Sequence, residues 1–205
     1  MRLATSFRRS LMLALVCCFA AGSASAGIPS PSNSTHDACF VVCPLGDITY
    51  HVTVLDLANN PCVNSTVTLD FSQCGFTHCA IQNGTITVNE AAHTMSTLSN
   101  AAGVAAFPLA MGGCCNSVNV YADGILLATV AMKSPDINAS LLVNGTDLGI
   151  VTGAVGTVNN CADLDCSGVI DNSDIGVVNA HLGHSCTGVV PTRSTTWGTL
   201  KTIYR

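Results

Sequence analysis

The sequence predicts a mainly β protein, in which an antiparallel β-sandwich precedes a small α-helical unit of two loops that each lead into a short helix. Residues of alternating polarity occupy the first part of the chain, which is the pattern of strands with one buried face. Oxygen-rich loops followed by helical stripes occupy residues 134–187. Frequent cysteines add a third observation, because disulfides stabilise small exported domains.

The first 26 residues are typical of a secretory signal peptide. Three arginines precede the apolar run of residues 11–21, and the small-residue motif Ala24-Ser25-Ala26 follows it. The apolar run is too short to span a bilayer stably. We therefore expect a chain that starts near Gly27, is secreted to the extracellular space or the cell surface, and does not span a membrane.

The charge of the remaining chain is strongly negative. All twelve acidic residues lie after residue 26, against only four of the seven basic residues, which gives a net charge of 4 minus 12, or −8. Nucleic-acid binding is excluded by this balance, because it needs several cations to neutralise phosphates. Half of the acids fall between Asp136 and Asp174, where the sequence has no Lys or Arg. Such crowding is unfavourable unless a cation relieves it.

Residues 27–37 are rich in Pro, Ser and Asn and predict a flexible linker. Residues 38–133 predict the sandwich, with strand-like alternation across 48–54 and 66–71 and more weakly across 86–88. Asn59-Asn60-Pro61 predicts a turn. Asp123-Gly124 predicts a tight hairpin whose second strand runs over residues 125–132, because both residues tolerate positive φ.

The sandwich region also resembles bacterial immunoglobulin-like domains of the invasin type. The resemblance rests on residues 52–56, the Asn60-Pro61 turn, residues 64–69 and the late Gly-x-Ala-x-Phe pattern of residues 103–107. It implies an immunoglobulin-like fold that serves as a spacer or adhesive module, with no chemistry of its own.

Residues 163–174 have the ligand spacing of a calcium-binding loop. Calcium takes six or more oxygen ligands, so a twelve-residue loop offers alternate side chains and one carbonyl, with glycine at the bend. Gly168 stands at that bend, position 6. The expected ligands are Asp163, Asp165, Ser167, the carbonyl of Val169, Asp171 and Asp174. The alternative is an Asp-rich turn that binds no ion.

Residues 136–147 repeat the pattern in a weaker form. The expected ligands are Asp136, Asn138, Ser140, the carbonyl of Leu142, Asn144 and Asp147. Leu141 replaces the glycine at position 6, and two carboxylates stand where the second loop has four. We therefore expect weaker calcium binding here, with a vacant loop as the alternative.

A helical stripe follows each loop, so two short helices can pack face to face. The stripes are Leu148, Val151 and Val155, then Ile175, Val178 and Leu182. Two such loop-helix units resemble a dockerin over residues 134–187. The resemblance implies docking onto a cohesin-like domain through loop positions 10 and 11, which are Gly145, Thr146, Asn172 and Ser173. The alternative is a structural subunit that contacts identical copies; a carbohydrate or cell-surface ligand is left open.

Ten cysteines remain after residue 26, an even number that favours disulfides. Seven precede residue 135 and three follow it, so full pairing needs at least one bridge between the two regions. We expect Cys161 to pair with Cys186 and to clasp the ends of the last unit. Zinc binding by the closely spaced pairs 39/43 and 74/79 is the alternative.

Catalytic motifs are not evident in the sequence, so we expect a protein that is not an enzyme. His181 and His184 lie three residues apart near a predicted helix end and could share a metal, but histidines that interact with the helix dipole are more common there. Residues 188–205 predict a linker and an amphipathic tail that either folds back or serves recognition.

Overall fold

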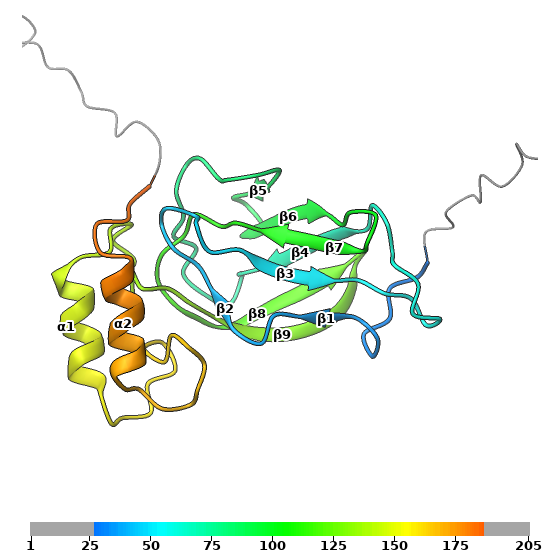
Figure 1. Cartoon of the computed structure of the whole chain (residues 1–205). Coiled ribbons are helices and arrows are strands. Elements are labelled where there is room, and N and C mark those ends of the chain that lie inside the picture. Colours follow the sequence, from blue (N-terminus) through cyan, green and yellow to red (C-terminus); the bar gives the residue numbers. More distant parts are fainter. Residues whose placement is uncertain (1–26, 187–205) are drawn as a thin grey trace, which may run out of the picture.

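The computed structural model describes residues 27–186, so the expected signal peptide and the expected tail lie outside the described residues (Figure 1). The chain is mainly β, as predicted. Its strands are β1 (Thr35–His36), β2 (Phe40–Val41), β3 (Tyr50–Thr53), β4 (Thr66–Asp70), β5 (Thr87–Asn89), β6 (Thr94–Leu98), β7 (Val104–Phe107), β8 (Cys115–Ala122) and β9 (Ile125–Lys133). Two helices follow, α1 (Gly145–Ala154) and α2 (Asn172–Ala180).

The strands form two sheets that share one hydrophobic core. One sheet has the order β1-β3-β7 and the other β2-β9-β8-β4-β6-β5, with β2 parallel to β9 and all other pairs antiparallel. Val52 and Phe107 of the first sheet are buried in the same cluster as Leu69 and Val120 of the second. Burial of both inner faces therefore holds the two sheets together.

Local patterns predict several of these strands correctly. In β3 the side chains of Tyr50 and Val52 are buried whereas that of His51 is exposed. The expected hairpin joins β8 to β9, with φ of 49° at Asp123 and 81° at Gly124. Both values lie in the left-handed region that such a two-residue turn requires.

Residues 27–37 are not a free linker, contrary to the prediction from their composition. Strand β1 lies within this segment and pairs with β3, and the backbone N–H of Ser30 donates to the carbonyl of Leu55 at 2.8 Å. The side chain of Ser30 is buried. Pairing with an available sheet edge satisfies the backbone groups of this segment despite its turn-forming residues.

The helices lie side by side at one end of the sheets (Figure 1). They form a second core in which Val151 of α1 and Val178 of α2 are fully buried. Cys43, Leu45 and Ile48, from the connection between β2 and β3, also belong to this core. The helical unit therefore shares its interior with the sandwich region. No helix among residues 27–186 is long and apolar enough to cross a membrane.

The predicted bridge between Cys161 and Cys186 is wrong. Cys161 pairs with Cys114, and Cys186 pairs with Cys79. The other bridges join Cys39 to Cys166 and Cys74 to Cys115. Three of the four bridges thus connect the sandwich region to residues after 134, because the helical unit packs against the sheets and brings its cysteines to them.

Candidate metal centre

The two predicted loops adopt the same backbone conformation. At position 4 the φ angles are 56° for Ala139 and 59° for Cys166, and at position 6 they are 60° for Leu141 and 84° for Gly168. Three of these four residues are not glycine, which is unusual because only glycine adopts the left-handed region without a steric cost. Their recurrence at matching positions indicates that the two segments are structural repeats, and that Leu141 is held where glycine would be favoured.

Each loop ends by capping a helix. Asn144 and Asp171, at position 9, accept a hydrogen bond from the backbone N–H two residues later, at 2.7 Å in both loops. The carboxylates of Asp147 and Asp174, at position 12, accept a hydrogen bond from the backbone N–H of the capping residue at 2.9 Å. These capping boxes start the helices at position 10. They also hold both position 12 carboxylates fully buried.

The second loop gathers three of its four carboxylates. Oxygen atoms of Asp163, Asp165 and Asp174 lie within 4.8 Å of one another. Oδ1 of Asp163 is buried and has no hydrogen-bond partner among residues 27–186. A buried oxygen without a hydrogen-bond partner is energetically unfavourable. A hydrogen-bond donor or a cation beside this oxygen would therefore stabilise the cluster. An all-oxygen donor set of this kind suits a hard cation.

Lys133 forms an ion pair with one carboxylate of this cluster. Its Nζ lies 3.0 Å from Oδ2 of Asp163, and only 3% of Lys133 is exposed. Burial by itself raises the pKa of Asp163, but the hydrogen bond and the positive charge of Lys133 outweigh it, and the net effect lowers this pKa. Sequence reasoning missed this ion pair because Lys133 precedes the acid-rich stretch and reaches it only through the fold.

In the first loop, the carboxylate at position 1 accepts hydrogen bonds from backbone N–H groups of the same loop. Oδ1 of Asp136 accepts from the backbone N–H of Ser140 at 2.9 Å, and Oδ2 accepts from that of Leu141 at 2.8 Å. Asp136 is fully buried, and burial raises its pKa despite these hydrogen bonds. The first loop does not gather three carboxylates, whereas the second does. The first loop, with only two carboxylates, therefore offers fewer charged oxygens than the second.

Other predicted ligands interact within their own loops. Asn144 and Asp171 cap helices, and Asp171 is not part of the carboxylate cluster. The hydroxyl of Ser167 donates to the carbonyl of Val169 at 3.0 Å, and that of Ser140 donates to the carbonyl of Leu142 at the same distance. Asn138 accepts from the N–H of Ser140. An ion would compete with these short-range hydrogen bonds for the same oxygens.

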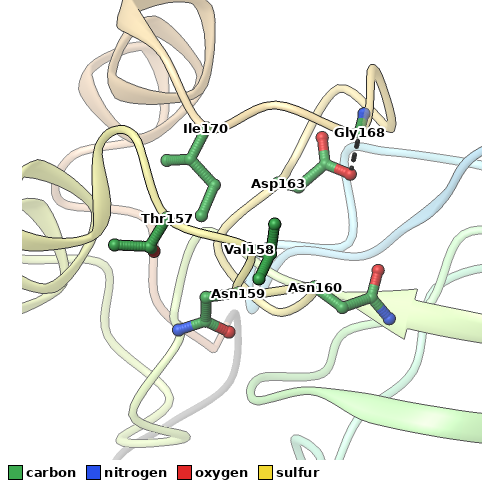
Figure 2. A pocket seen from close by; sticks show the side chains of 7 residues that line it. All are labelled: Thr157, Val158, Asn159, Asn160, Asp163, Gly168 and Ile170. Atoms are coloured by element: carbon green, nitrogen blue, oxygen red, sulfur yellow. Dashed lines mark hydrogen bonds between the residues drawn. The ribbon is translucent and has the colours of Figure 1, made fainter.

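A pocket lies beside the second loop, and Figure 2 shows Asp163 and Gly168 on its wall with their hydrogen bond of 3.2 Å. The other lining residues come from the segment after α1 and from the loop itself: Thr157, Val158, Asn159, Asn160 and Ile170. Asp163 is the only charged residue of this lining. The pocket therefore connects solvent with Asp163, the position 1 carboxylate of the loop.

The residues predicted to contact a partner lie at the two helix N-termini. Gly145 and Thr146 are the first two residues of α1, and Asn172 and Ser173 are the first two of α2. All four are exposed. They are therefore accessible, and their position is set by the same loops that hold the carboxylates.

A second group of possible metal ligands lies where the helical unit meets the sandwich. It consists of Cys43, Asp47, His181 and His184, whose ligand atoms all lie within 4.8 Å of one another. The only signal in the sequence is the spacing of the two histidines. Cys43 and Asp47 are more than 130 residues away, so no local motif joins the four. Burial raises the pKa of the Cys43 thiol to about 12, which keeps it protonated near neutral pH in the absence of a metal.

No protein-family model, curated protein or solved structure matches the chain.

Proposed function

We propose that this chain is a secreted, non-catalytic calcium-binding scaffold or adhesion protein whose paired loop-helix unit docks onto a cohesin-like domain. One observation carries the calcium part: two loops repeat the same backbone, the same helix cap and the same buried position 12 carboxylate. A repeat at this level of geometry supports a common ligand for both loops, because oxygen-bearing side chains also recur at positions 1, 3 and 5.

The donor chemistry of the second loop fits calcium. Asp163, Asp165 and Asp174 supply carboxylate oxygens, and the unpartnered Oδ1 of Asp163 is available to an ion without loss of a hydrogen bond. Calcium bound there would neutralise charges that Lys133 balances only in part. The first loop would follow with lower affinity, because the oxygens of Asp136 already accept backbone hydrogen bonds.

The docking part of the proposal rests on the helix N-termini. Since the loops fix where α1 and α2 begin, calcium would order the surface formed by Gly145, Thr146, Asn172 and Ser173. These four residues are exposed and lie outside the carboxylate cluster of the second loop. A partner that binds to this surface would therefore do so only when calcium is bound to the loops.

A pull-down with a panel of cohesin domains, in calcium and in chelator, tests the proposal. We expect capture in calcium and none in chelator. Substitution of Asn172 and Ser173 by arginine should abolish capture while calcium affinity stays within about twofold, because neither residue belongs to the carboxylate cluster. Capture that is unchanged in the double variant would contradict the assigned surface. Substitution of exposed Thr152 on α1 to arginine is a control for added charge.

A second candidate function is favoured by the disulfides. Three bridges fasten the helical unit to the sandwich region, whereas a freely presented docking module would need none of them. In this alternative the chain is a structural subunit of an extracellular assembly, and calcium only stabilises its fold. Sedimentation velocity distinguishes the two, because a self-assembling subunit would form large particles and would ignore cohesins.

A further inference from the structure

We propose that Cys43, Asp47, His181 and His184 form a closed, structural zinc site that joins the helical unit to the sandwich. This site is separate from the calcium loops and does not depend on the proposed docking function. Asp47 and Cys43 come from the connection between β2 and β3, and the histidines come from the segment that follows α2. In Figure 1 these two segments lie next to each other at the end of the sheets.

Four of the six distances between the ligand atoms are close to the edges of a zinc tetrahedron, and the other two, from Sγ of Cys43 to Asp47 and to His181, do not exceed 4.8 Å. Sγ of Cys43 lies 3.5 Å from Nδ1 of His184, and the two histidine Nδ1 atoms lie 3.2 Å apart. Oδ2 of Asp47 lies 3.4 Å from Nδ1 of His181 and 3.2 Å from that of His184. Bond lengths of about 2.0–2.1 Å to nitrogen or oxygen and about 2.3 Å to sulfur, at tetrahedral angles, require edges of about 3.3 Å and about 3.5 Å.

Hydrogen bonding alone explains this arrangement less well. Both histidines direct the same ring atom, Nδ1, toward one carboxylate oxygen and toward each other. A hydrogen atom on one Nδ1 can form a hydrogen bond along only one of these contacts. A cation at the centre would instead interact with all the ligand atoms at once. One thiolate, one carboxylate and two imidazoles are four ligands that zinc accepts together, and calcium does not take sulfur or nitrogen ligands of this kind.

The pairing of the cysteines supports the assignment. Eight of the ten cysteines among residues 27–186 form disulfides, and Cys43 and Cys62 are free. Cys62 lies in the sandwich core, and its thiol donates a hydrogen bond to the carbonyl of Gly27 at 3.3 Å. Cys43 instead faces histidine and aspartate. Both thiols are free, but only that of Cys43 lies beside other groups that can bind a metal.

The consequence is structural. Four protein ligands close the coordination shell, so the site has no open position for a substrate. His184 is two residues from Cys186, whose bridge to Cys79 ties the same end of the chain to the sandwich. Zinc would therefore attach the segment after α2 to the sandwich at a second point, in addition to the disulfide. Because Cys43 belongs to the second core, the same zinc would also hold α2 against that core.

Titration of the oxidised protein with Co²⁺, in saturating calcium, tests the site. Calcium occupies the oxygen-only loops, and cobalt bound there would give no thiolate charge-transfer band in any case. We expect one equivalent of cobalt, a thiolate band, the intense visible absorption of tetrahedral Co²⁺, and displacement by one equivalent of zinc. A titration without the thiolate band, or with the weak absorption of octahedral cobalt, would overturn the proposal.

Substitution of single residues tests which side chains bind the metal. Cys43→Ser should lose the thiolate band and weaken zinc binding by more than the about 100-fold that loss of an outer-shell partner costs. Cys62→Ser removes the other free thiol and should change neither. His184→Gln, at a partly exposed position, should lose the tetrahedral spectrum even if Cys43→Ser does not fold, and His36→Gln is its exposed control. Equal spectra for Cys43→Ser and Cys62→Ser, or an unchanged spectrum in His184→Gln, would refute the assignment.

Discussion

Gly168 shows how one backbone angle can control a loop. Its φ of 84° lies in the left-handed region, and a Cβ added there would meet no atom within 4 Å. Any cost of substitution is therefore conformational and not steric. Left-handed geometry costs an L-residue about 1–2 kcal/mol.

We expect Gly168→Ala to lower the free energy of unfolding by about 1–2 kcal/mol and to weaken calcium binding by the second loop. Gly176→Ala is the matched control, because Gly176 lies inside α2 with equally open space and no positive φ. That control should stabilise the protein by about 0.5–1 kcal/mol, since alanine favours the helix. Chemical denaturation measures both, and changes of the same sign would contradict the explanation.

Lys133 has a double role as a neighbour of Asp163. In the calcium-free protein its ammonium stabilises the carboxylate, but the same charge repels a cation. We expect Lys133→Met to lower calcium-free stability by about 3–5 kcal/mol, the cost of leaving one partner of a buried pair alone. Calcium affinity should rise in the same variant. Calorimetry that finds weaker calcium binding would show that Lys133 helps to build the loop and does not oppose the ion.

The same ion pair predicts the acid response of the calcium-free protein. Because the pKa of Asp163 is lowered on folding, the pair contributes stability above the unfolded pKa, and this contribution is lost as the pH falls through the lower folded pKa. The window lies below about pH 4. In Lys133→Met this loss should disappear. Unfolding free energies measured across that range test the expectation, and parallel curves for the two proteins would disprove it.

At the scale of elements, Gly112 lets the first loop approach the sheets. A Cβ at this position, just before β8, would overlap Oδ2 of Asp136. We expect Gly112→Ala to destabilise the protein by about 1–3 kcal/mol and to disturb the first loop more than the second. Gly75→Ala is the control, because a Cβ at Gly75 would meet no atom within 4 Å. Hydrogen exchange resolves the two loops, and equal effects on both would rule out this local contact.

Elements defined by short-range patterns were predictable from the sequence. The β8-β9 hairpin follows from Asp123-Gly124, and the loop repeat follows from oxygen spacing, because both depend on neighbours within a dozen residues. Strand β1 was not predictable. Its Pro- and Ser-rich surroundings indicate a linker, and it is a strand only because β3 offers a free edge.

At the scale of the whole molecule, sequence reasoning failed where distant residues meet. The expected bridge from Cys161 to Cys186 assumed a self-contained unit, but the helices share a core with the connection between β2 and β3. The same assumption hid the cluster around Cys43. With seven cysteines before residue 135 and three after it, full pairing would need at least one bridge across the boundary. Pairing is not full, because Cys43 and Cys62 are free, but three bridges do cross the boundary.

One of these bridges ties the second loop to the sandwich region. Cys166 stands at position 4 of the second loop in the left-handed region, and its partner Cys39 immediately precedes β2. The bridge holds the loop against the sandwich before an ion arrives, so it should reduce the conformational entropy that calcium binding must otherwise overcome. Its sequence separation of 127 residues also restricts the unfolded chain strongly.

We therefore expect joint substitution of Cys39 and Cys166 by serine to weaken calcium binding by the second loop and to lower stability by about 4 kcal/mol. Joint substitution of Cys74 and Cys115 is the control, because both cysteines of that bridge belong to the sandwich region and neither lies in a loop. It should lower stability while calcium affinity stays unchanged. Calorimetric titration of both variants, with stability measured in calcium and in chelator, separates the effects. If both variants lost calcium affinity equally, the loop would depend on overall stability and not on its own attachment to the sandwich.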